Sequence, residues 1–342
     1  MSASDSLFIV VGSDDRYAMP LAVTLCSALG RLPADTTPVV MVVDGGITAP
    51  NRERVERVIS NSHSAVDVQW VDPQVDQFTD LRTTNWGSPA SYLPLLIPAL
   101  APDRSRALYL DSDLLVRADL TKLWDSQPPG DATPLAAVRD FGFVRLADAL
   151  RGDAAARLGL DGEAPYFNSG VMLMNLDVWR ETQIPERAFE FARDHPDAMR
   201  FTDQDALNAV IQSDWQQLDE RWNVLIGSID RLVDLRAGSP SEQEALRRRL
   251  LDDPYIVHFS GPRKPWKPGY RRTGRAEYLT EVEGSDWFDS PSEHRAWARR
   301  RAMRSPLANA KRVTTKALWP AVVGSRNLRA RIRGQEVQKR DD

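Results

Sequence analysis

The sequence predicts an α/β protein with a mostly parallel β-sheet that helices cover on both faces. Apolar runs such as LFIVV and VVMVV are continuous rather than alternating, which is typical of strands buried on both sides. Stretches with helical spacing separate these runs, and alternation of strands and helices favours a parallel sheet. The 342 residues are 42% apolar and 27% charged, a composition that excludes disordered and fibrous chains.

The N-terminal part predicts four strands, each an apolar run ended by turn residues, at residues 7–11, 38–46, 66–72 and within 106–116. Two helices separate the first three strands, over residues 17–29 and 51–61. Leu21, Leu25 and Ala28 recur at helical spacing in the first helix, which gives it one apolar face.

The rest of the chain continues the pattern with strands at residues 135–138, 170–175 and 256–259. Helices are expected over residues 186–194, 203–211 and 239–251. Thr202 can cap the second of these helices through its hydroxyl. Ser241 precedes Glu244 by three residues, which is the spacing of a capping box at the start of the third.

Charge is distributed unevenly along the chain. The total of 48 acidic and 44 basic side chains gives a net charge of −4, yet residues 291–342 hold 14 basic and only 4 acidic side chains. An acidic body and a basic tail suggest two different partners. We therefore expect one main domain over residues 1–287 and a basic, helical extension over residues 288–342.

The single cysteine, Cys26, excludes an intramolecular disulfide and a cysteine-based zinc site. The N-terminus lacks the positive region and the apolar length of a signal peptide. No apolar run approaches the 20 or so residues that span a bilayer. These features favour a cytoplasmic protein, which would lie at the inner face of the membrane if the tail binds lipid.

Acidic residues follow the predicted strands, namely Asp14, Asp15, Asp44, Asp111 and Asp113. In open α/β sheets, ligands bind beyond the carboxyl ends of the strands. Two carboxylates two residues apart at one strand end can share a divalent cation, and hard oxygen ligands suit Mg²⁺ or Mn²⁺. The alternative is that Asp111 and Asp113 are solvated turn residues.

The segment HFSGPRKPW contains three further candidates. His258, just after a strand, could complete a metal site, although a buried histidine of the core is the alternative. Gly261 permits close backbone approach to a ligand. Lys264 is a cation suited to a diphosphate oxygen, or else a solvated surface charge.

Amide and acidic side chains also begin two predicted elements. In YFNSGVMLMNLDVWR, Asn168 would lie at the start of a strand and could orient sugar hydroxyls, or it could be a turn residue. In TDQDALNAV, Asp203 and Asp205 favour the positive end of the helix dipole. Helix capping could explain these acids, but it does not explain Gln204.

Together these motifs resemble glycosyltransferase family 8, the retaining GT-A enzymes that include glycogenin and bacterial lipopolysaccharide galactosyl- and glucosyltransferases. The resemblance covers about residues 7–270 and is carried, in order, by VVGSDDRYAMPLAVTLCSAL, VVDGGI, LYLDSDLLV, LWD, YFNSGVMLMNLDVWR, DQDALN and HFSGPRKPW. It implies a GT-A fold with a Rossmann-like sheet, and transfer of a glucose or galactose from a UDP-sugar to a glycan or lipid-linked acceptor in polysaccharide biosynthesis.

The resemblance also implies roles for individual residues. The ligands of Mn²⁺, or of Mg²⁺ in its place, would be Asp111, Asp113 and His258. The nucleotide would contact Val11, Asp14 and Asp15 at the uridine, Ser112 at the ribose, and Gly261 and Lys264 at the diphosphate. The donor sugar would face Asn168, Asp203 and Gln204, with Gln204 nearest the anomeric carbon, where front-face attack is favoured because an amide is a poor nucleophile.

One position departs from the family pattern. Pro94 stands in SYLPLLIP where the family usually has an arginine. A donor-site cation is therefore missing or supplied by another residue, such as Arg82 or Arg263. This departure also motivates an alternative function, a non-catalytic sugar-nucleotide or membrane-binding module. Sugar-nucleotide synthesis ranks lowest, because the chain lacks an N-terminal glycine-rich loop ending in a basic residue.

The basic tail mixes arginine and lysine with Trp297, Leu307, Leu318 and Trp319. Cationic residues with interfacial aromatics suit a helix on an anionic membrane surface. A solvated tail is the alternative. No recognisable nucleic-acid-binding module is present in the sequence.

Overall fold

The computed structural model describes residues 6–73, 81, 89–126, 130 and 132–302. The chain divides into two compact units, Met1–Pro265 with Arg271–Asp289, and Trp266–Tyr270 with Ser290–Asp342. The predicted domain boundary after residue 287 stays a prediction.

A seven-stranded sheet forms the centre of the first unit, in the order β3-β2-β1-β4-β7-β6-β8. Its strands are β1 (Phe8–Ser13), β2 (Val39–Asp44), β3 (Asp67–Val71), β4 (Arg106–Leu110), β6 (Leu135–Arg139), β7 (Phe167–Asn175) and β8 (Gln216–Gln217). Neighbours from β3 to β4 pair in parallel, as do β6 and β8, whereas β7 is antiparallel to β4 and β6. The mostly parallel sheet is confirmed, with β7 as its antiparallel member.

A second sheet of three strands contains β5 (Leu114–Val116), β10 (Ile256–His258) and β9 (Val224–Leu225), with β10 in the middle. The strand predicted within residues 106–116 is therefore two strands, β4 and β5, which belong to different sheets. The chain leaves the large sheet at Asp111 and enters the small one at Leu114. The predicted metal ligands Asp111 and Asp113 lie in this short crossing.

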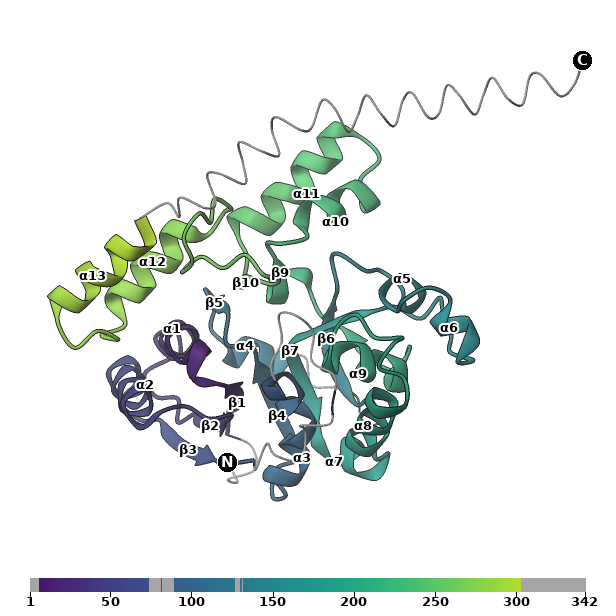
Figure 1. Cartoon of the computed structure of the whole chain (residues 1–342), viewed down its shortest axis with the longest axis horizontal. Coiled ribbons are helices and arrows are strands. Elements are labelled where there is room, and N and C mark those ends of the chain that lie inside the picture. The colour runs from purple at the N-terminus through teal and green to yellow at the C-terminus, as the bar shows by residue number, and fades with distance from the viewer. Residues whose placement is uncertain (1–5, 74–80, 82–88, 127–129, 131, 303–342) are drawn as a thin grey trace, which may run out of the picture. The chain divides into compact units, whose positions relative to one another are not determined.

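Helices lie along the large sheet, with α1 and α2 beside β1 and β2, and α8 and α9 beside β7 (Figure 1). The α-helices of the first unit are α1 (Ala18–Leu29), α2 (Ala49–Ser62), α3 (Ile97–Leu100), α4 (Thr121–Ser126), α5 (Leu146–Ala149), α6 (Ala154–Arg157), α7 (Leu176–Glu181), α8 (Ile184–Asp194), α9 (Asp203–Ile211), α10 (Ile229–Arg236), α11 (Pro240–Asp252) and α12 (Arg275–Gly284). The 3₁₀ helices among its described residues are Asp15–Tyr17, Pro89–Leu96 and Glu220–Asn223.

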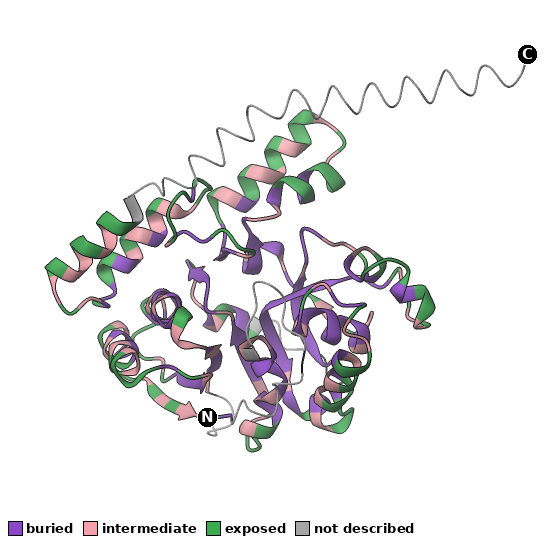
Figure 2. Ribbon diagram, viewed as in Figure 1, coloured by how far each residue is buried: buried purple, intermediate pink, exposed green. Residues whose placement is uncertain are grey.

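The strands of the large sheet are buried, and exposed residues concentrate on the outer sides of the helices (Figure 2). Ile9, Val10 and Val11 of β1 are all inaccessible to solvent, so both faces of this strand are covered. Burying one such side chain contributes about 1.5–3 kcal/mol. The continuous apolar runs thus correspond to strands packed on both sides.

Two helix starts differ from the prediction. The capping box of α11 joins Ser239 and Glu242, not Ser241 and Glu244, because Ser239 is the last residue with extended backbone before the helix. Thr202 stands at the N-cap of α9, but its hydroxyl donates to the Asp203 carboxylate at 3.1 Å. Thr202 therefore does not cap the helix with its side chain.

Side chains of α1 bind the backbone of β5. Thr24 Oγ1 donates to the Leu114 carbonyl at 3.0 Å and accepts from the Leu114 N–H at 3.1 Å. Ser27 Oγ accepts from the Val116 N–H at 3.0 Å. These bonds satisfy backbone groups on the edge of β5 that faces away from β10, and they fix the chain just after Asp113.

In the second unit, α13 (Pro291–Ala302) begins after Ser290, whose hydroxyl accepts from the Glu293 N–H at 3.2 Å. None of the helices in the described part of the chain has both the length and the apolar character needed to cross a membrane. The tail residues Leu307, Leu318 and Trp319 lie outside the described residues.

Candidate active site

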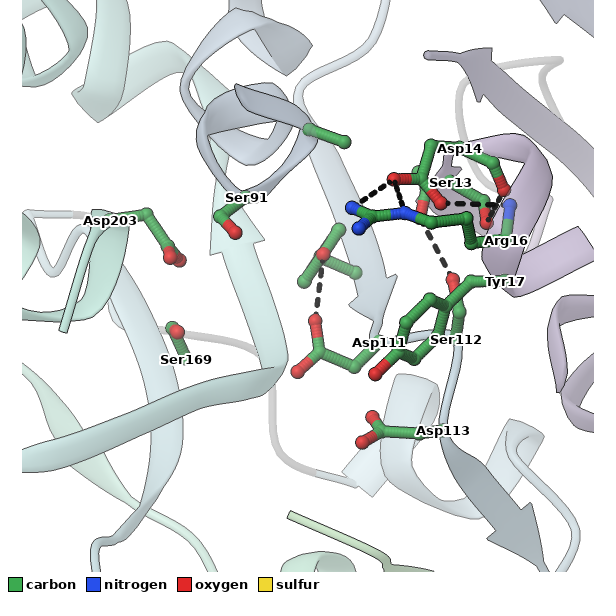
Figure 3. A pocket seen from close by; sticks show the side chains of 13 residues that line it. Ser13, Asp14, Arg16, Tyr17, Ser91, Asp111, Ser112, Asp113, Ser169 and Asp203 are labelled. Atoms are coloured by element: carbon green, nitrogen blue, oxygen red, sulfur yellow. Dashed lines mark hydrogen bonds and ion pairs between the residues drawn. The ribbon is translucent and has the colours of Figure 1, made fainter. Parts of the chain in front are cut away.

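A cavity of about 200 Å³ opens where β1 and β4 end. Asp14 and Arg16 line it on one side and Asp203 on the other, with Asp111 and Asp113 between them (Figure 3). The cavity thus lies beyond the carboxyl ends of parallel strands, as expected for an open α/β sheet.

Asp111, Asp113 and His258 form a cluster that could hold a metal ion, with one ligand atom from each within 4.8 Å of the others. His258 Nε2 lies 3.3 Å from Asp113 Oδ1 and 3.7 Å from Asp111 Oδ2. Two carboxylates and an imidazole are a donor set that suits Mn²⁺, and two carboxylates also suit Mg²⁺. The residues present therefore fit a divalent cation.

Pairing of β10 with β5 brings His258 to this cluster. His258 lies opposite Leu114 in the antiparallel register, and the Phe259 N–H donates to the Asp113 carbonyl at 3.1 Å. The imidazole is nearly fully buried, so it is directed inward at the acids rather than into solvent. Each candidate ligand stands at a strand end in the sequence, and the pairing of β5 with β10 in the small sheet brings the three side chains together.

Gly170 of β7 packs directly against the side chains of Asp111 and His258. A β-carbon on this residue would stand 2.5 Å from His258 Cε1 and 2.7 Å from Asp111 Oδ2. The Gly170 carbonyl also accepts from the Asp111 N–H at 2.8 Å. Only glycine leaves room for both metal-ligand side chains at this position.

Lys264 is buried against the cluster, where its ammonium group donates to the Asp113 carboxylate and, at 2.9 Å, to the Phe259 carbonyl. Burial by itself raises the pKa of Asp113, but the charge of Lys264, together with its hydrogen bond and the contributions of His258, outweighs burial and holds that pKa well below its ordinary range. Burial, and then the charge of Asp113, raise the pKa of Asp111. A cation bound between the two acids would relieve this repulsion.

A network of amides lies beside the metal cluster. Asn168 Nδ2 donates to Gln204 Oε1 at 2.8 Å and to Asp140 Oδ2 at 3.1 Å, and Gln204 Nε2 donates to Asp140 Oδ2 at 3.3 Å. The Ser169 N–H also donates to Gln204 Oε1, at 3.3 Å. All four side chains are buried.

Asn168 is the second residue of β7, so the alternative of a turn residue is wrong. The register of β6 against β7 shifts between Ala137 and Val138, and Val138 pairs with Asn168. Such a bulge re-aims side chains near active sites. The sequence reasoning missed Asp140, although it follows an apolar strand just as Asp111 does.

Asp203 lines the cavity from the start of α9. Burial, and then the charge of Asp111, raise the pKa of Asp203 to about 7. This carboxyl group therefore changes its charge near neutral pH, which distinguishes it from a solvated helix-capping acid.

At the end of the cavity after β1, Asp14 and Ser112 line its wall. The Asp14 carboxylate accepts from the Arg16 N–H at 3.1 Å and from Arg16 Nη2 at 2.9 Å. Ser112 Oγ donates to the Gly12 carbonyl at 2.8 Å. Arg16 is a cavity-lining cation that the sequence reasoning did not select, although it directly follows the two acids after β1.

Val11 and Asp15 are placed behind this wall. Val11 is fully buried within β1. Asp15 Oδ1 accepts from the Thr48 N–H at 2.8 Å, from Thr48 Oγ1 at 2.7 Å and from Asn51 Nδ2 at 2.8 Å, so it anchors the start of α2. These contacts account for the carboxylate of Asp15 without a ligand.

Gly261, Pro94 and Arg263 are not among the described residues that line the cavity. Gly261 is exposed and has φ of 80°, a conformation that glycine adopts without strain. Pro94 is buried in the 3₁₀ helix Pro89–Leu96. Arg263 is exposed, and Arg82 lies outside the described residues.

Comparisons with known proteins agree with this geometry. The galactosyltransferase LgtC, solved in complex with donor and acceptor sugar analogs, superposes with a TM-score of 0.69 at 26% identity over 85% of this chain and 100% of that chain. General stress protein A of Bacillus subtilis (strain 168) is 29% identical over 293 residues, which are 84% of this chain and 96% of that protein. Lipopolysaccharide 1,2-glucosyltransferase of Escherichia coli (strain K12) is 25% identical over 217 residues, 63% of this chain and 60% of that protein.

The profile that describes Glycosyl transferase family 8 matches residues 8–268, which include the whole acidic cluster and the loop that carries Lys264. The fold is accordingly GT-A, and the chain is a glycosyltransferase that belongs to family 8.

Proposed function

We propose that this chain is a retaining hexosyltransferase that moves glucose or galactose from a UDP-sugar to a hydroxyl group of a glycan or lipid-linked acceptor. The observation that carries the proposal is the convergence of Asp111, Asp113 and His258 in a cavity that Asp203 also lines. The E. coli relative is a lipopolysaccharide glucosyltransferase and LgtC a galactosyltransferase, which supports a hexose donor.

The diphosphate end of the donor would lie at the metal cluster. Asp111, Asp113 and His258 would hold Mn²⁺, which when bound supplies a Lewis acid for the departing UDP. Lys264 stands against Asp113 as a fixed cation, and stabilises negative charge that develops on the leaving phosphate. Gly261 would let the loop backbone approach the diphosphate.

The sugar would face Asn168, Asp203 and Gln204, which position it rather than exchange protons. Gln204 Oε1 already accepts from Asn168 Nδ2 and from the Ser169 N–H. A carboxamide oxygen engaged in this way is a poor nucleophile, which favours attack by the acceptor from the leaving-group face. LgtC too has a glutamine in its active site, replaced by glutamate in one solved structure.

The nucleoside would occupy the end of the cavity after β1. Asp14 and Ser112 line that end, and we assign them to the uracil and the ribose. Val11 and Asp15 would shape the same wall from behind, Val11 through packing and Asp15 through its bonds to Thr48.

Release of UDP from UDP-glucose and UDP-galactose, measured with Mn²⁺, with Mg²⁺ and with EDTA, tests the proposal. We expect turnover that requires a divalent cation, and a product whose anomeric configuration, read by NMR, matches that of the donor. Turnover that is unchanged in EDTA would reject the metal assignment. Tight UDP binding without turnover on any donor or acceptor would support the alternative, a non-catalytic sugar-nucleotide-binding module.

A further inference from the structure

Asn223 is a fully buried polar residue at the end of the 3₁₀ helix Glu220–Asn223, just before β9. Its side chain bridges two parts of the site. Nδ2 donates to Asn168 Oδ1 at 2.8 Å, and Oδ1 lies 2.9 Å from His258 Nδ1. A buried amide retained between two site residues calls for a reason, because a buried polar group without a hydrogen-bond partner is destabilising.

The direction of these hydrogen bonds follows from one backbone donor. The Gly170 N–H donates to Asn168 Oδ1 at 3.1 Å, so that oxygen is an acceptor. Asn223 must then direct its NH₂ group to Asn168, which leaves its oxygen for His258. An amide oxygen only accepts, so His258 Nδ1 must carry a proton.

A neutral imidazole with a proton on Nδ1 has its lone pair on Nε2. Nε2 is the nitrogen that lies 3.3 Å from Asp113 Oδ1 and 3.7 Å from Asp111 Oδ2. Metal-binding histidines commonly donate their second ring N–H to a partner that fixes the tautomer and the ring orientation. Here His258 Nδ1 donates to Asn223 Oδ1, Asn223 Nδ2 donates to Asn168 Oδ1, and the Gly170 N–H donates to the same Asn168 oxygen. This arrangement leaves the lone pair on the metal-facing Nε2.

We propose that Asn223 is a positioning residue that fixes the His258 tautomer for metal binding and at the same time holds Asn168 toward the sugar site. This inference rests on the proposed metal-dependent transfer. The main chain supports the placement independently, because His258 pairs with Leu225 in parallel register and the Tyr255 N–H donates to the Arg221 carbonyl at 2.8 Å. Replacing the Asn223 side chain therefore leaves the strand pairing that presents His258.

The first test measures Mn²⁺ binding to the full-length protein by electron paramagnetic resonance of free Mn²⁺, without donor. Asn223→Leu removes both hydrogen bonds at similar volume, and we expect the Kd for Mn²⁺ to rise about 10- to 100-fold. Asn223→Asp retains an oxygen toward His258 and should keep tight Mn²⁺ binding, while it weakens donor use because it faces Asn168 with an acceptor. Asn223→Ser replaces the leucine variant if that variant does not fold.

Asn208 provides the matched control. It is equally buried, but its side chain bonds the backbone of Phe167 and Gln204 rather than His258. Asn208→Leu should therefore lower the thermal unfolding midpoint without the loss of Mn²⁺ affinity.

The second test reads the tautomer directly by ¹⁵N NMR of histidine-labelled, metal-free protein at pH 8. The chain has only four histidines, and His258→Gln assigns the signal. We expect a proton on Nδ1 in the wild type, and a mixture of tautomers in Asn223→Leu. An unchanged tautomer and an unchanged Kd in a folded Asn223→Leu would overturn the inference and leave the proposed function intact. A wild type that binds no Mn²⁺ would instead overturn the metal site itself.

Discussion

Gly170 and His258 are in contact across the two sheets of the catalytic unit. The imidazole lies where the β-carbon of any other residue at position 170 would project, with only 2.5 Å between that β-carbon and His258 Cε1. Gly170 belongs to the antiparallel strand β7 of the large sheet, and His258 ends β10 of the small sheet. The missing side chain of one strand thus makes room for the imidazole supplied by the other.

Gly170→Ala should therefore disable the site with little loss of fold. The added methyl group displaces His258 and Asp111, and a shift of about 1 Å in reacting groups can cost on the order of 100-fold in rate. We expect kcat/KM for UDP release to fall by that order and Mn²⁺ affinity to fall with it. Gly284→Ala is the control, because a β-carbon there meets nothing within 4 Å. Equal activity of both variants would contradict this account of Gly170.

Asp113→Asn removes the carboxylate of a proposed metal ligand, which is also the ion-pair partner of Lys264. We expect turnover to drop on the order of 100- to 1000-fold, as when one electrostatic stabiliser of a transition state is lost. Stability should fall by about 3–5 kcal/mol, because the buried Lys264 ammonium loses its ion-pair partner. Asp103→Asn, at an exposed turn, serves as the control in both the UDP-release assay and thermal unfolding. Full activity of Asp113→Asn at low Mn²⁺ would exclude Asp113 as a ligand.

Asp203 predicts a pH dependence of stability in EDTA. Its pKa is raised by burial to about 7, against about 4 in an unfolded chain. Between these values the native state binds a proton that the unfolded state lacks, so the free energy of unfolding falls as pH rises from about 4 to 7 and then levels off. Asp203→Asn removes this loss of stability. The unfolding midpoint of the variant, relative to that of the wild type, should therefore be higher at pH 8 than at pH 5. The exposed Asp194→Asn variant should show the same pH dependence of the unfolding midpoint as the wild type. The same pH dependence in all three proteins would refute the raised pKa of Asp203.

Thr24 should matter for stability although it is not among the residues that line the cavity. Thr24→Val keeps the shape of the side chain but leaves the N–H and the carbonyl of Leu114 without their buried partner. Each unsatisfied buried group costs about 1–3 kcal/mol, so we expect a loss of at least that size in urea unfolding. The exposed Thr37→Val should be neutral. A neutral Thr24→Val would mean that other groups satisfy the edge of β5.

The basic extension predicts binding to anionic lipid. Full-length protein should co-sediment with vesicles that contain phosphatidylglycerol, less so with phosphatidylcholine vesicles, and a chain that ends at Trp287 should lose most of this binding. The attraction amounts to about 1 kcal/mol per basic residue near the surface, and high salt should weaken it. Equal binding of both chains would reject the tail as a membrane anchor.

Local sequence patterns predicted most of the large sheet. The apolar runs at residues 7–11 and 38–46 correspond to β1 and β2, because strands covered on both faces need apolar side chains at every position. The segment 106–116, predicted to contain one strand, holds two, β4 and β5. Apolar residues flank Asp111 and Asp113 on both sides. This pattern does not reveal that the residues before Asp111 belong to one sheet and those after Asp113 to another.

The sequence by itself also determined which residue types stand at the strand ends, including Asp111, Asp113 and His258. Their meeting depends on the fold, because hydrogen bonding between β5 and β10 joins segments about 140 residues apart in the chain. The roles of Gly170 and Asn223 follow from that meeting alone. Neither side chain titrates or binds the metal. Gly170 acts through the space that it leaves for His258, and Asn223 acts through its hydrogen bond to His258.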